Sequence, residues 1–355
     1  MVISGRRWIG FAPRHPTHWI TVFSTRLSAA MANSLVDVHV LTGFLGSGKT
    51  TVLRHLLAAP DLAETAVLVN EFGAVGLDHL LVAAIEGEPV LLGGGCVCCT
   101  LRSDVGQALR DLWAKQARGQ IPSFRRVVIE TTGLADPTPI MATVAGDLAL
   151  RHHFSPGQVI TTVDSVNGAK TLARYPESAQ QAGAADVLLV TKRDIAPSES
   201  LETLRSSLRA MNPVARIEVI EGGKVSPEIM LRVDIGDQIA RATHWAGRPV
   251  GNKVLHGGIA TCIIEHDRPI DWAAFGLWFS LLAHRHGARI LRMKGILALE
   301  GSETPVLVQA AQHLVHPPEH LPLGTAPTGQ SSLVLIVDGL DPILLRESFD
   351  VIVAT

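Results

Sequence analysis

Short apolar runs rich in β-branched residues alternate with longer segments of helical spacing from residue 36 to about residue 225. The runs that predict strands are residues 36–41, 66–69, 90–92, 127–129, 159–163, 187–190 and 217–220. Helical spacing lies between them, most clearly at 51–59, 101–117 and 197–211. Strands that are apolar on both faces have helices on both sides. The pattern therefore predicts an α/β fold, with a doubly wound, mostly parallel sheet and helices on both faces.

The alternation stops after residue 225. Residues 241–258 are rich in Gly, Pro, His and Trp without a clear period, which predicts a linker over residues 226–257. Beyond it the pattern predicts strands at 259–264, 288–299, 305–311 and 333–337, and a helix at 270–284. Asp341-Pro342 is a typical helix start and predicts a final helix. We therefore expect a first domain at 37–225 and a smaller C-terminal α+β domain at 258–355.

The first 36 residues differ from the rest because they contain no Asp or Glu and carry four arginines. This composition resembles a weak targeting segment. An extended or misassigned start upstream of Met31 is the favoured explanation. Residues 1–36 are expected to be an N-terminal extension outside the fold.

Composition narrows the class of protein. Of 355 residues, 47% are hydrophobic and 18% charged, which excludes a disordered chain. The formal net charge of −2 gives no electrostatic reason to expect nucleic acid or a membrane as partner. The longest apolar stretch, 272–283, is too short to span a bilayer and predicts a buried helix. Its expected core-facing stripe is Trp272, Phe275, Phe279 and Leu282.

Residues 43–50 read Gly-Phe-Leu-Gly-Ser-Gly-Lys-Thr and match the phosphate-binding pattern G-x-x-x-x-G-K-[ST]. The glycines allow a tight turn whose amide N–H groups point at phosphate oxygens. We expect Lys49 to reach the β- and γ-phosphates and Thr50 to bind Mg²⁺. The residues expected to bind nucleotide here are Gly43, Gly46, Ser47, Gly48, Lys49, Thr50 and Thr51.

A second segment of this site follows the strand predicted at 127–129. Glu130 is placed where a carboxylate would hold Mg²⁺ and its waters. Gly133 would offer its amide to the γ-phosphate and so sense hydrolysis. Lys49, Thr50, Glu130 and Gly133 are the residues expected to act in hydrolysis.

A third segment, residues 191–194, follows the strand predicted at 187–190. The Asp194 carboxylate can accept from both N1–H and N2–H of guanine, which adenine cannot offer. The stem of Lys192 would lie along the base. Thr191 stands where such patterns usually have Asn, so an amide contact is lost. Guanine is favoured over adenine.

Three of the four cysteines, Cys96, Cys98 and Cys99, follow three glycines within one short segment. Thiolates bind metals, and a nearby helix N-terminus lowers a thiol pKa. Three sulfurs leave a tetrahedral ion one open position, which suits a transferable ion. Softness favours Zn²⁺ or Cu⁺, and Co²⁺ accepts the same geometry. A buried apolar cluster and a redox pair are the alternatives.

Other candidates carry less weight. Glu71 would give an oxygen to Mg²⁺ or to the thiolate-bound ion, although a solvated loop glutamate is nearly as simple. Asp78 and His79 are further candidates, and Cys262 in an apolar strand is expected in the core. A second metal site at His313, His316 and His320 is less favoured than a structural loop, because Pro317 and Pro318 lie among them. So few cysteines indicate a reducing compartment, and we expect a cytoplasmic protein.

These motifs together resemble the CobW-type metallochaperone GTPases, whose wider group includes GTPases that insert nickel into hydrogenase and urease. The resemblance covers residues from about 37 to the end of the chain. It rests on residues 42–51, 69–73, 94–102, 130–137 and 191–194, and in the C-terminal part on 294–297, 309–313 and 316–318.

The resemblance implies a GTPase that binds zinc, or next cobalt, in the GTP-bound state and gives it to a client metalloprotein or metal-cofactor enzyme. By position it makes Cys96, Cys98 and Cys99 the metal ligands, Glu130 the carboxylate of the Glu-x-x-Gly signature, and Asp194 the guanine-selecting residue. The implied cofactors are GTP, Mg²⁺ and Zn²⁺ or Co²⁺. A homodimer is compatible with it, with neither nucleic acid nor membrane as partner.

The sequence differs from the family pattern in two respects, and two other functions are compatible with the same motifs. Thr191 replaces the commoner Asn, and the linker has only His244 and His256 near it instead of a dense histidine run. A regulatory sensor would bind nucleotide and metal without delivering the ion. A P-loop kinase would carry the cysteines incidentally.

Overall fold

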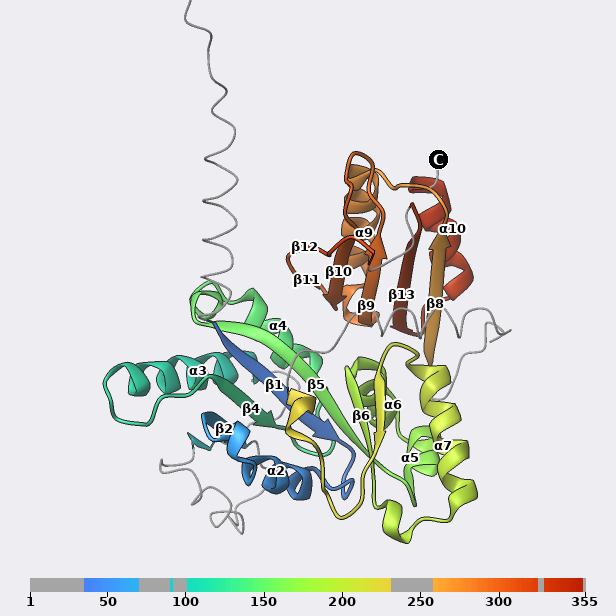
Figure 1. Cartoon of the computed structure of the whole chain (residues 1–355). Helices are drawn as coiled ribbons and strands as arrows, with labels where there is room; N and C mark the ends of the chain where they lie inside the picture. The colour runs from blue at the N-terminus through green and yellow to red at the C-terminus, as the bar shows by residue number, and fades with distance from the viewer. Residues whose placement is uncertain (1–34, 70–89, 92–100, 231–257, 325–328, 354–355) are drawn as a thin grey trace, which may run out of the picture. The chain divides into compact units, whose positions relative to one another are not determined.

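The computed structural model describes residues 35–69, 90–91, 101–230, 258–324 and 329–353 (Figure 1). The expected N-terminal extension up to residue 34 and residues 231–257 of the expected linker lie outside them. Within this part of the chain, no helix is long and apolar enough to cross a bilayer.

Seven of the described strands form a sheet in the order β3-β2-β4-β1-β5-β6-β7. Each neighbouring pair is parallel. This confirms the predicted doubly wound sheet. The strands are β1 (Val36–Gly43), β2 (Thr65–Val69), β3 (Val90–Leu91), β4 (Arg126–Glu130), β5 (Phe154–Asp164), β6 (Val187–Thr191) and β7 (Arg216–Val219).

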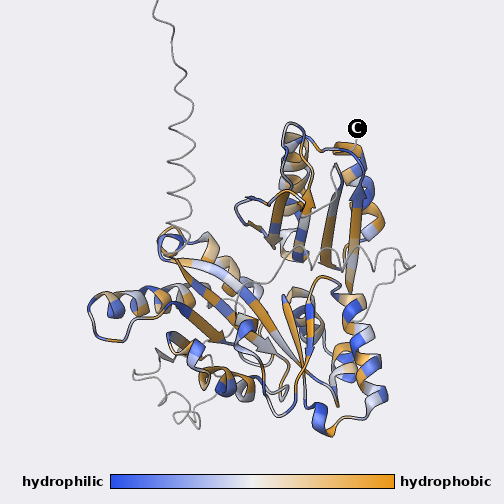
Figure 2. Ribbon diagram, in the orientation of Figure 1, coloured by the Kyte–Doolittle hydropathy of each residue, from blue (hydrophilic) through white to orange (hydrophobic). Residues whose placement is uncertain are grey.

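Helices cover both faces of this sheet because successive strand residues point to opposite sides. Val40 packs with α3 and α4 on one face, while Leu41 packs with α2 on the other. Helices α6 and α7 pack on Leu188 and Val190 of β6. Figure 2 shows the strands as mainly hydrophobic and the helices as mixed. The helices are α2 (Lys49–Leu57), α3 (Leu101–Ala117), α4 (Thr138–Gly146), α5 (Gly168–Arg174), α6 (Pro176–Ala184) and α7 (Ser198–Met211).

The second sheet is antiparallel and has the order β11-β10-β9-β13-β8 among the described strands, with β12 beside β10. Asp271 caps its first helix by accepting from the amides of Ala273 and Ala274. The smaller α+β fold is confirmed. Its elements are β8 (Ile259–His266), α9 (Trp272–His286), β9 (Ile290–Leu297), β10 (Val306–Ala311), β11 (Leu314–Val315), β12 (Glu319–His320), β13 (Ser331–Asp338) and α10 (Pro342–Ile352).

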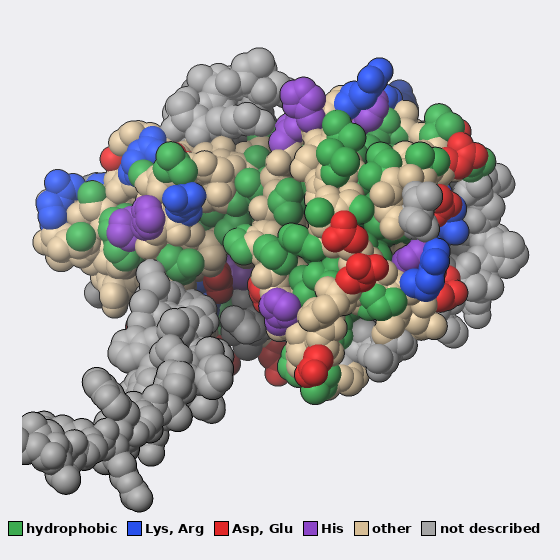
Figure 3. Space-filling model, turned by 90° about the horizontal axis from the view of Figure 1, so that it is seen from above, with side chains coloured by type: hydrophobic (Ala, Val, Ile, Leu, Met, Phe, Trp, Pro, Cys, Tyr) green, Lys and Arg blue, Asp and Glu red, His purple; other side chains and the backbone are tan. Residues whose placement is uncertain are grey.

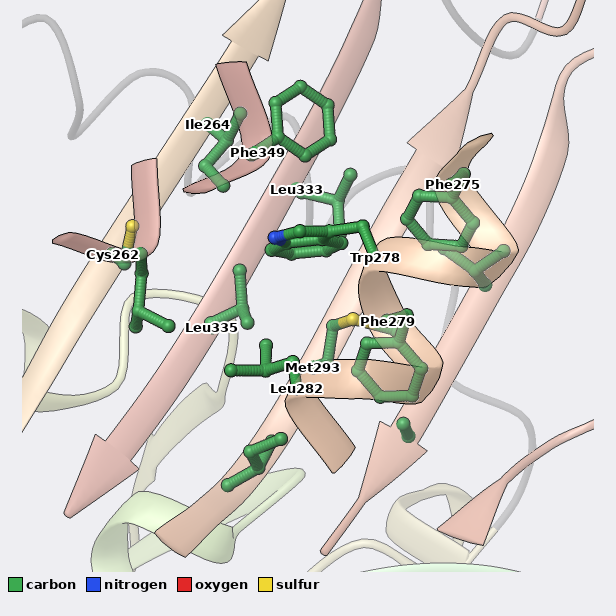
Figure 4. Packing of buried hydrophobic residues seen from close by; sticks show 14 of the residues in the cluster. Cys262, Ile264, Phe275, Trp278, Phe279, Leu282, Met293, Leu333, Leu335 and Phe349 are labelled. Carbon is green, nitrogen blue, oxygen red and sulfur yellow. The ribbon is translucent and has the colours of Figure 1, made fainter. Parts of the chain in front are cut away.

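The core of this second sheet corrects one expectation. Phe275, Phe279 and Leu282 are buried as predicted, but Trp272 is 44% exposed. Trp272 is the first residue of α9, directly after the cap, whereas Trp278 lies in the middle of the helix. Trp278 is buried, and its indole N–H donates to the Ser348 hydroxyl at 2.9 Å. Figure 4 shows the Trp278 ring among Leu333, Leu335 and Phe349.

Both sheets belong to one compact unit, Val36–Thr355. Gly183 of α6 lies against Leu291 of β9 and Ile336 of β13. Asp186, just before β6, is almost fully buried and pairs with both Arg292 and Lys294 of β9. The two sheets therefore share apolar packing and a buried group of charges.

Charge is dispersed on the face of the molecule drawn in Figure 3. Lys and Arg side chains lie there in small groups among acidic, histidine and hydrophobic side chains.

Candidate nucleotide-binding site

The phosphate loop joins β1 to α2 and is shaped by glycines. Gly43 has φ +141°, and a Cβ there would lie 2.3 Å from the Thr162 hydroxyl, so a side chain does not fit. Gly48 begins α2 with φ +97°, a conformation that glycine adopts without strain. The Ser47 and Thr162 hydroxyls lie 2.6 Å apart, which ties the loop to β5.

Lys49 already lies over this loop. Its ammonium donates to the carbonyl oxygens of Gly43 at 2.8 Å and Phe44 at 3.3 Å. Burial lowers the pKa of Lys49 from its ordinary value, and the charge of Glu130 opposes that shift. The cation is thus held at the phosphate loop, where the motif predicts that a lysine meets the β- and γ-phosphates.

Thr50 and Glu130 are 80 positions apart in the sequence but contact each other in the structure. The Thr50 hydroxyl donates to Glu130 Oε1 at 2.7 Å, and Glu130 is only 6% exposed. A hydroxyl and a carboxylate side by side are hard oxygen ligands of the kind Mg²⁺ takes beside a phosphate. The residues present therefore fit a magnesium ion.

The turn after β4 lies directly on the phosphate loop. The Thr131 hydroxyl donates to the Thr42 hydroxyl at 2.8 Å, and the Thr131 amide donates to the Leu41 carbonyl. A Cβ on Gly133 would lie 2.8 Å from the Cα of Leu45. Only a residue without a side chain allows so close an approach, which accounts for glycine at this position.

Residues 191–194 follow β6 at the same edge of the sheet. The Thr191 hydroxyl donates to the Ser47 carbonyl at 2.7 Å, so this residue binds the phosphate loop even without an amide. Lys192 adopts the left-handed conformation with φ 59° and donates to Asp164 Oδ2 at 2.7 Å. Burial alone would raise the pKa of Asp164, but hydrogen bonds from Lys192 and its own turn lower it.

Asp194 lies in a short 3₁₀ turn, Arg193–Ile195, and is exposed. Its carboxylate is therefore accessible to a base. The loop after β7 also contacts the site, because Gly223, at φ +76°, packs on Thr51.

A pocket of about 380 Å³ adjoins the phosphate loop. Phe44 of the loop stacks on Tyr175 with ring centroids 4.7 Å apart. Arg174 lies 5.5 Å from the centroid of the same ring, and Lys192 lines the pocket as well. Positive charge thus borders the space beside the predicted phosphate site.

The expected transition-metal ligands Cys96, Cys98, Cys99 and Glu71 lie outside the described residues, as do Asp78 and His79. Among the residues that are described, no group of three or more His, Cys, Asp or Glu side chains could hold a metal ion. The C-terminal histidines accordingly do not form a site there. Cys262 is buried in the core of the second sheet, as expected (Figure 4).

Several contacts of the site were not predicted from the sequence. Among them are Ser47 with Thr162, Lys192 with Asp164, and Gln181 of α6 with the turn after β4. Thr162 and Asp164 had a usable signal, because they end a strand at the edge where the phosphate loop begins. A glutamine inside a short helix has no such signal.

Comparison with known proteins identifies the family of this chain. The sequence-family model of the CobW/HypB/UreG nucleotide-binding domain matches residues 37–218. The family model of the cobalamin synthesis protein cobW C-terminal domain matches residues 259–353. The zinc chaperone YjiA of Escherichia coli is 31% identical over 281 residues, which cover 79% of this chain and 87% of that protein. The zinc chaperone CobW of Pseudomonas aeruginosa is 30% identical over 310 residues, covering 77% and 80%.

A solved structure extends the similarity to three dimensions. The crystal structure of Zn(II)-bound YjiA GTPase from E. coli aligns with a TM-score of 0.65 at 25% sequence identity. The alignment covers 90% of this chain and 99% of that one. With both family models matched in order along its length, this chain belongs to the CobW/HypB/UreG family and carries its CobW C-terminal domain.

Proposed function

We propose that this protein is a GTP-hydrolysing metallochaperone that binds a transition metal and transfers it to a client metalloprotein or metal-cofactor enzyme. Zinc is the favoured ion and cobalt is the second candidate. The names of its relatives, zinc chaperones and a zinc-bound GTPase, support a metal-handling GTPase. A cytoplasmic location suits thiolate ligands, which need a reducing compartment.

The observation that carries the proposal is the register of three neighbouring strands. Leu91, the last residue of β3, lies opposite Val69 of β2, and Val69 lies opposite Glu130 of β4. Parallel strands are about 4.8 Å apart, so β3 ends about 10 Å from Glu130. The segment with Cys96, Cys98 and Cys99 starts just beyond Leu91, and Glu71 follows Val69 by two residues. The segments that carry the predicted metal ligands thus begin at the sheet edge where the phosphate site lies.

Each residue of the phosphate site has a distinct role in this proposal. Lys49 neutralises the β- and γ-phosphates, and the amide of Gly133 contacts the γ-phosphate. Thr50 and Glu130 would hold Mg²⁺, which, when bound, supplies positive charge between the phosphate oxygens. Asp194 selects guanine by accepting its N1–H and N2–H.

The two sites are coupled in the proposed cycle. GTP binding and thiolate binding of the ion are coupled through the segments that carry Glu71, the cysteines and Gly133, so the thiolates bind the ion more tightly when GTP is bound. Loss of the γ-phosphate weakens the binding of the ion. A coupling of about 1 to 3 kcal/mol would change metal affinity by roughly 5- to 150-fold, and metal would tighten GTP by the same factor.

The test is the zinc affinity of the whole chain with a non-hydrolysable GTP analogue, with GDP and without nucleotide. We expect the tightest binding with the analogue. Equal affinities in all three states would contradict a metallochaperone cycle. Transfer of isotopic zinc to an apo client only when GTP is hydrolysed would separate a chaperone from a sensor, and phosphate moved to an acceptor other than water would indicate a kinase.

A further inference from the structure

The side chain of Gln181 in α6 contacts the turn that follows β4. Its amide nitrogen donates to the carbonyl oxygens of Gly133 at 3.3 Å and Ala135 at 3.0 Å. The side chain is 1% exposed, so water does not compete for these hydrogen bonds. Both N–H groups of one amide are therefore committed to one short piece of backbone.

The same turn also contacts the phosphate loop. Gly133 packs so closely on Leu45 that a Cβ would lie 2.8 Å from the Leu45 Cα. The turn therefore contacts both the loop that would hold phosphates and the amide of Gln181.

The orientation of the Gln181 amide follows from its partners. Reversing it would place Oε1 against two carbonyl oxygens, which repel it. In the orientation observed, Oε1 is buried and has no hydrogen-bond partner among the described residues. A buried acceptor without a partner is unfavourable. The two hydrogen bonds that the amide nitrogen donates therefore determine the orientation of the side chain.

The backbone that carries Gln181 is itself held firmly. The Gln181 carbonyl accepts from the Thr161 hydroxyl of β5 at 3.0 Å. At the end of α6 the Asn212 amide donates to the carbonyls of Ala182, Gly183 and Ala185. Helix α6 is thus a fixed support from which one side chain extends to the turn.

We propose that Gln181 is a positioning residue for GTP hydrolysis. By holding the carbonyls of Gly133 and Ala135, its amide fixes the two peptide groups on the C-terminal side of Gly133. This limits the rotation of the backbone at Gly133, whose own N–H would contact the γ-phosphate. The inference rests on the proposed GTPase function. GDP lacks the γ-phosphate, so its binding does not depend on this contact.

The test compares Gln181→Met and Gln181→Glu with Gln180→Met in the whole chain. Gln180 is the neighbouring glutamine of α6, and its amide donates to Asp338 at 3.1 Å instead of the turn. We expect Gln181→Met to lower kcat at least tenfold while GDP affinity stays within twofold of the native protein. Gln180→Met is expected to keep kcat within twofold.

Gln181→Glu supplies a readout that a merely structural role would not move. An ionised carboxylate cannot donate to the two carbonyls, whereas the protonated acid can donate to one of them. Its kcat relative to the native protein should therefore rise as the pH is lowered from 8 to 6, while the ratio for Gln181→Met stays flat. This variant has the shape of the native residue, so it decides the question even if Gln181→Met does not fold.

Two outcomes would overturn the assignment. One is a folded Gln181→Met protein with kcat within twofold of native, and the other is a Gln181→Glu ratio that does not change with pH. A native protein that hydrolyses no GTP would instead contradict the proposed function, and that measurement comes before any variant.

Discussion

The Thr191 hydroxyl donates a 2.7 Å hydrogen bond to the Ser47 carbonyl and so joins the end of β6 to the phosphate loop. Thr191 is 3% exposed, and its β-carbon lies 3.7 Å from where a Cβ on Gly48 would be. The position that usually holds Asn thus keeps a direct hold on the loop through a shorter side chain.

Replacing Thr191 with Val should weaken GTP binding. The change keeps the shape of the side chain but leaves the buried Ser47 carbonyl without this donor, which costs about 1–3 kcal/mol. We expect GTP affinity to fall by about tenfold in equilibrium titration. Thr191→Ser keeps the hydroxyl and should bind GTP within about twofold of native. Native GTP affinity in Thr191→Val together with a loss in Thr191→Ser would show that the methyl group, and not the hydrogen bond, matters.

Glu130→Gln should separate nucleotide binding from hydrolysis. The amide keeps the size of the carboxylate but removes the negative charge that would hold Mg²⁺. Single-turnover hydrolysis should fall by about a hundredfold or more, since each tenfold loss corresponds to about 1.4 kcal/mol of barrier. GDP affinity should change little. Glu64→Gln, at an exposed carboxylate paired with Arg125, is the matched control and should hydrolyse GTP at the native rate.

Removing a thiol should abolish zinc binding only when that thiol belongs to the predicted metal-binding segment. We expect Cys98→Ala to lose bound zinc by elemental analysis, because two sulfurs remain where three are needed. Cys262→Ala should keep the native zinc content. Burial raises the pKa of the Cys262 thiol to about 11, so it stays protonated and is a poor metal ligand. Zinc retained in Cys98→Ala would place the metal site elsewhere.

Asp194→Asn should change base preference without destroying the phosphate site. The new amide can no longer accept two hydrogen bonds from guanine, but it can donate to the 2-oxo group of xanthine. We expect GTP affinity to fall by about a hundredfold or more and the affinity for xanthosine triphosphate to rise, measured by competition. If adenosine and guanosine triphosphates bind equally to the native chain, this assignment of Asp194 is wrong.

Stability should fall in acid in two stages. Burial lowers the pKa of His39 and of His316 to about 4, below the ordinary 6.5, so unfolding takes up protons as the pH falls from 6.5 to 4. Burial opposes ionisation of Asp186, but Arg292 and Lys294 lower its pKa to about 2, and its contribution is lost between pH 3.8 and 2. Denaturant titrations should show the free energy of unfolding decreasing over both ranges. His316→Gln should flatten the first stage, and an unchanged slope would contradict it.

Periodicity predicted most of the fold because the inner strands β4 and β6 are almost entirely apolar and buried, which marks them clearly in the sequence. It missed the first five residues of β5, where Pro156 and Gly157 normally interrupt a strand. They are accommodated where the pairing of β1 with β5 shifts register between Val38 and Val40. A Cβ on Gly157 would lie 2.8 Å from the ring of His39, a contact no local pattern shows.

The residues of the candidate site also divide into those that the sequence predicted and those that it did not. Lys49, Thr50 and Glu130 stand in short motifs, so the sequence predicted that they lie together, as the structure shows. Asp164 and Gln181 reach the site from distant segments, and their roles depend on which strands and helices are neighbours. Such contacts become visible only when the sheet order is known.

The buried pairing of Asp186 with Arg292 and Lys294 limits how this chain can be recombined with its relatives. A chimera that received a foreign C-terminal half lacking both cations would strand a carboxylate in an apolar environment, at a cost of several kcal/mol. Exchange of halves within the family should therefore succeed only when acid and bases travel together. The buried charges therefore make the stability of each half depend on the sequence of the other.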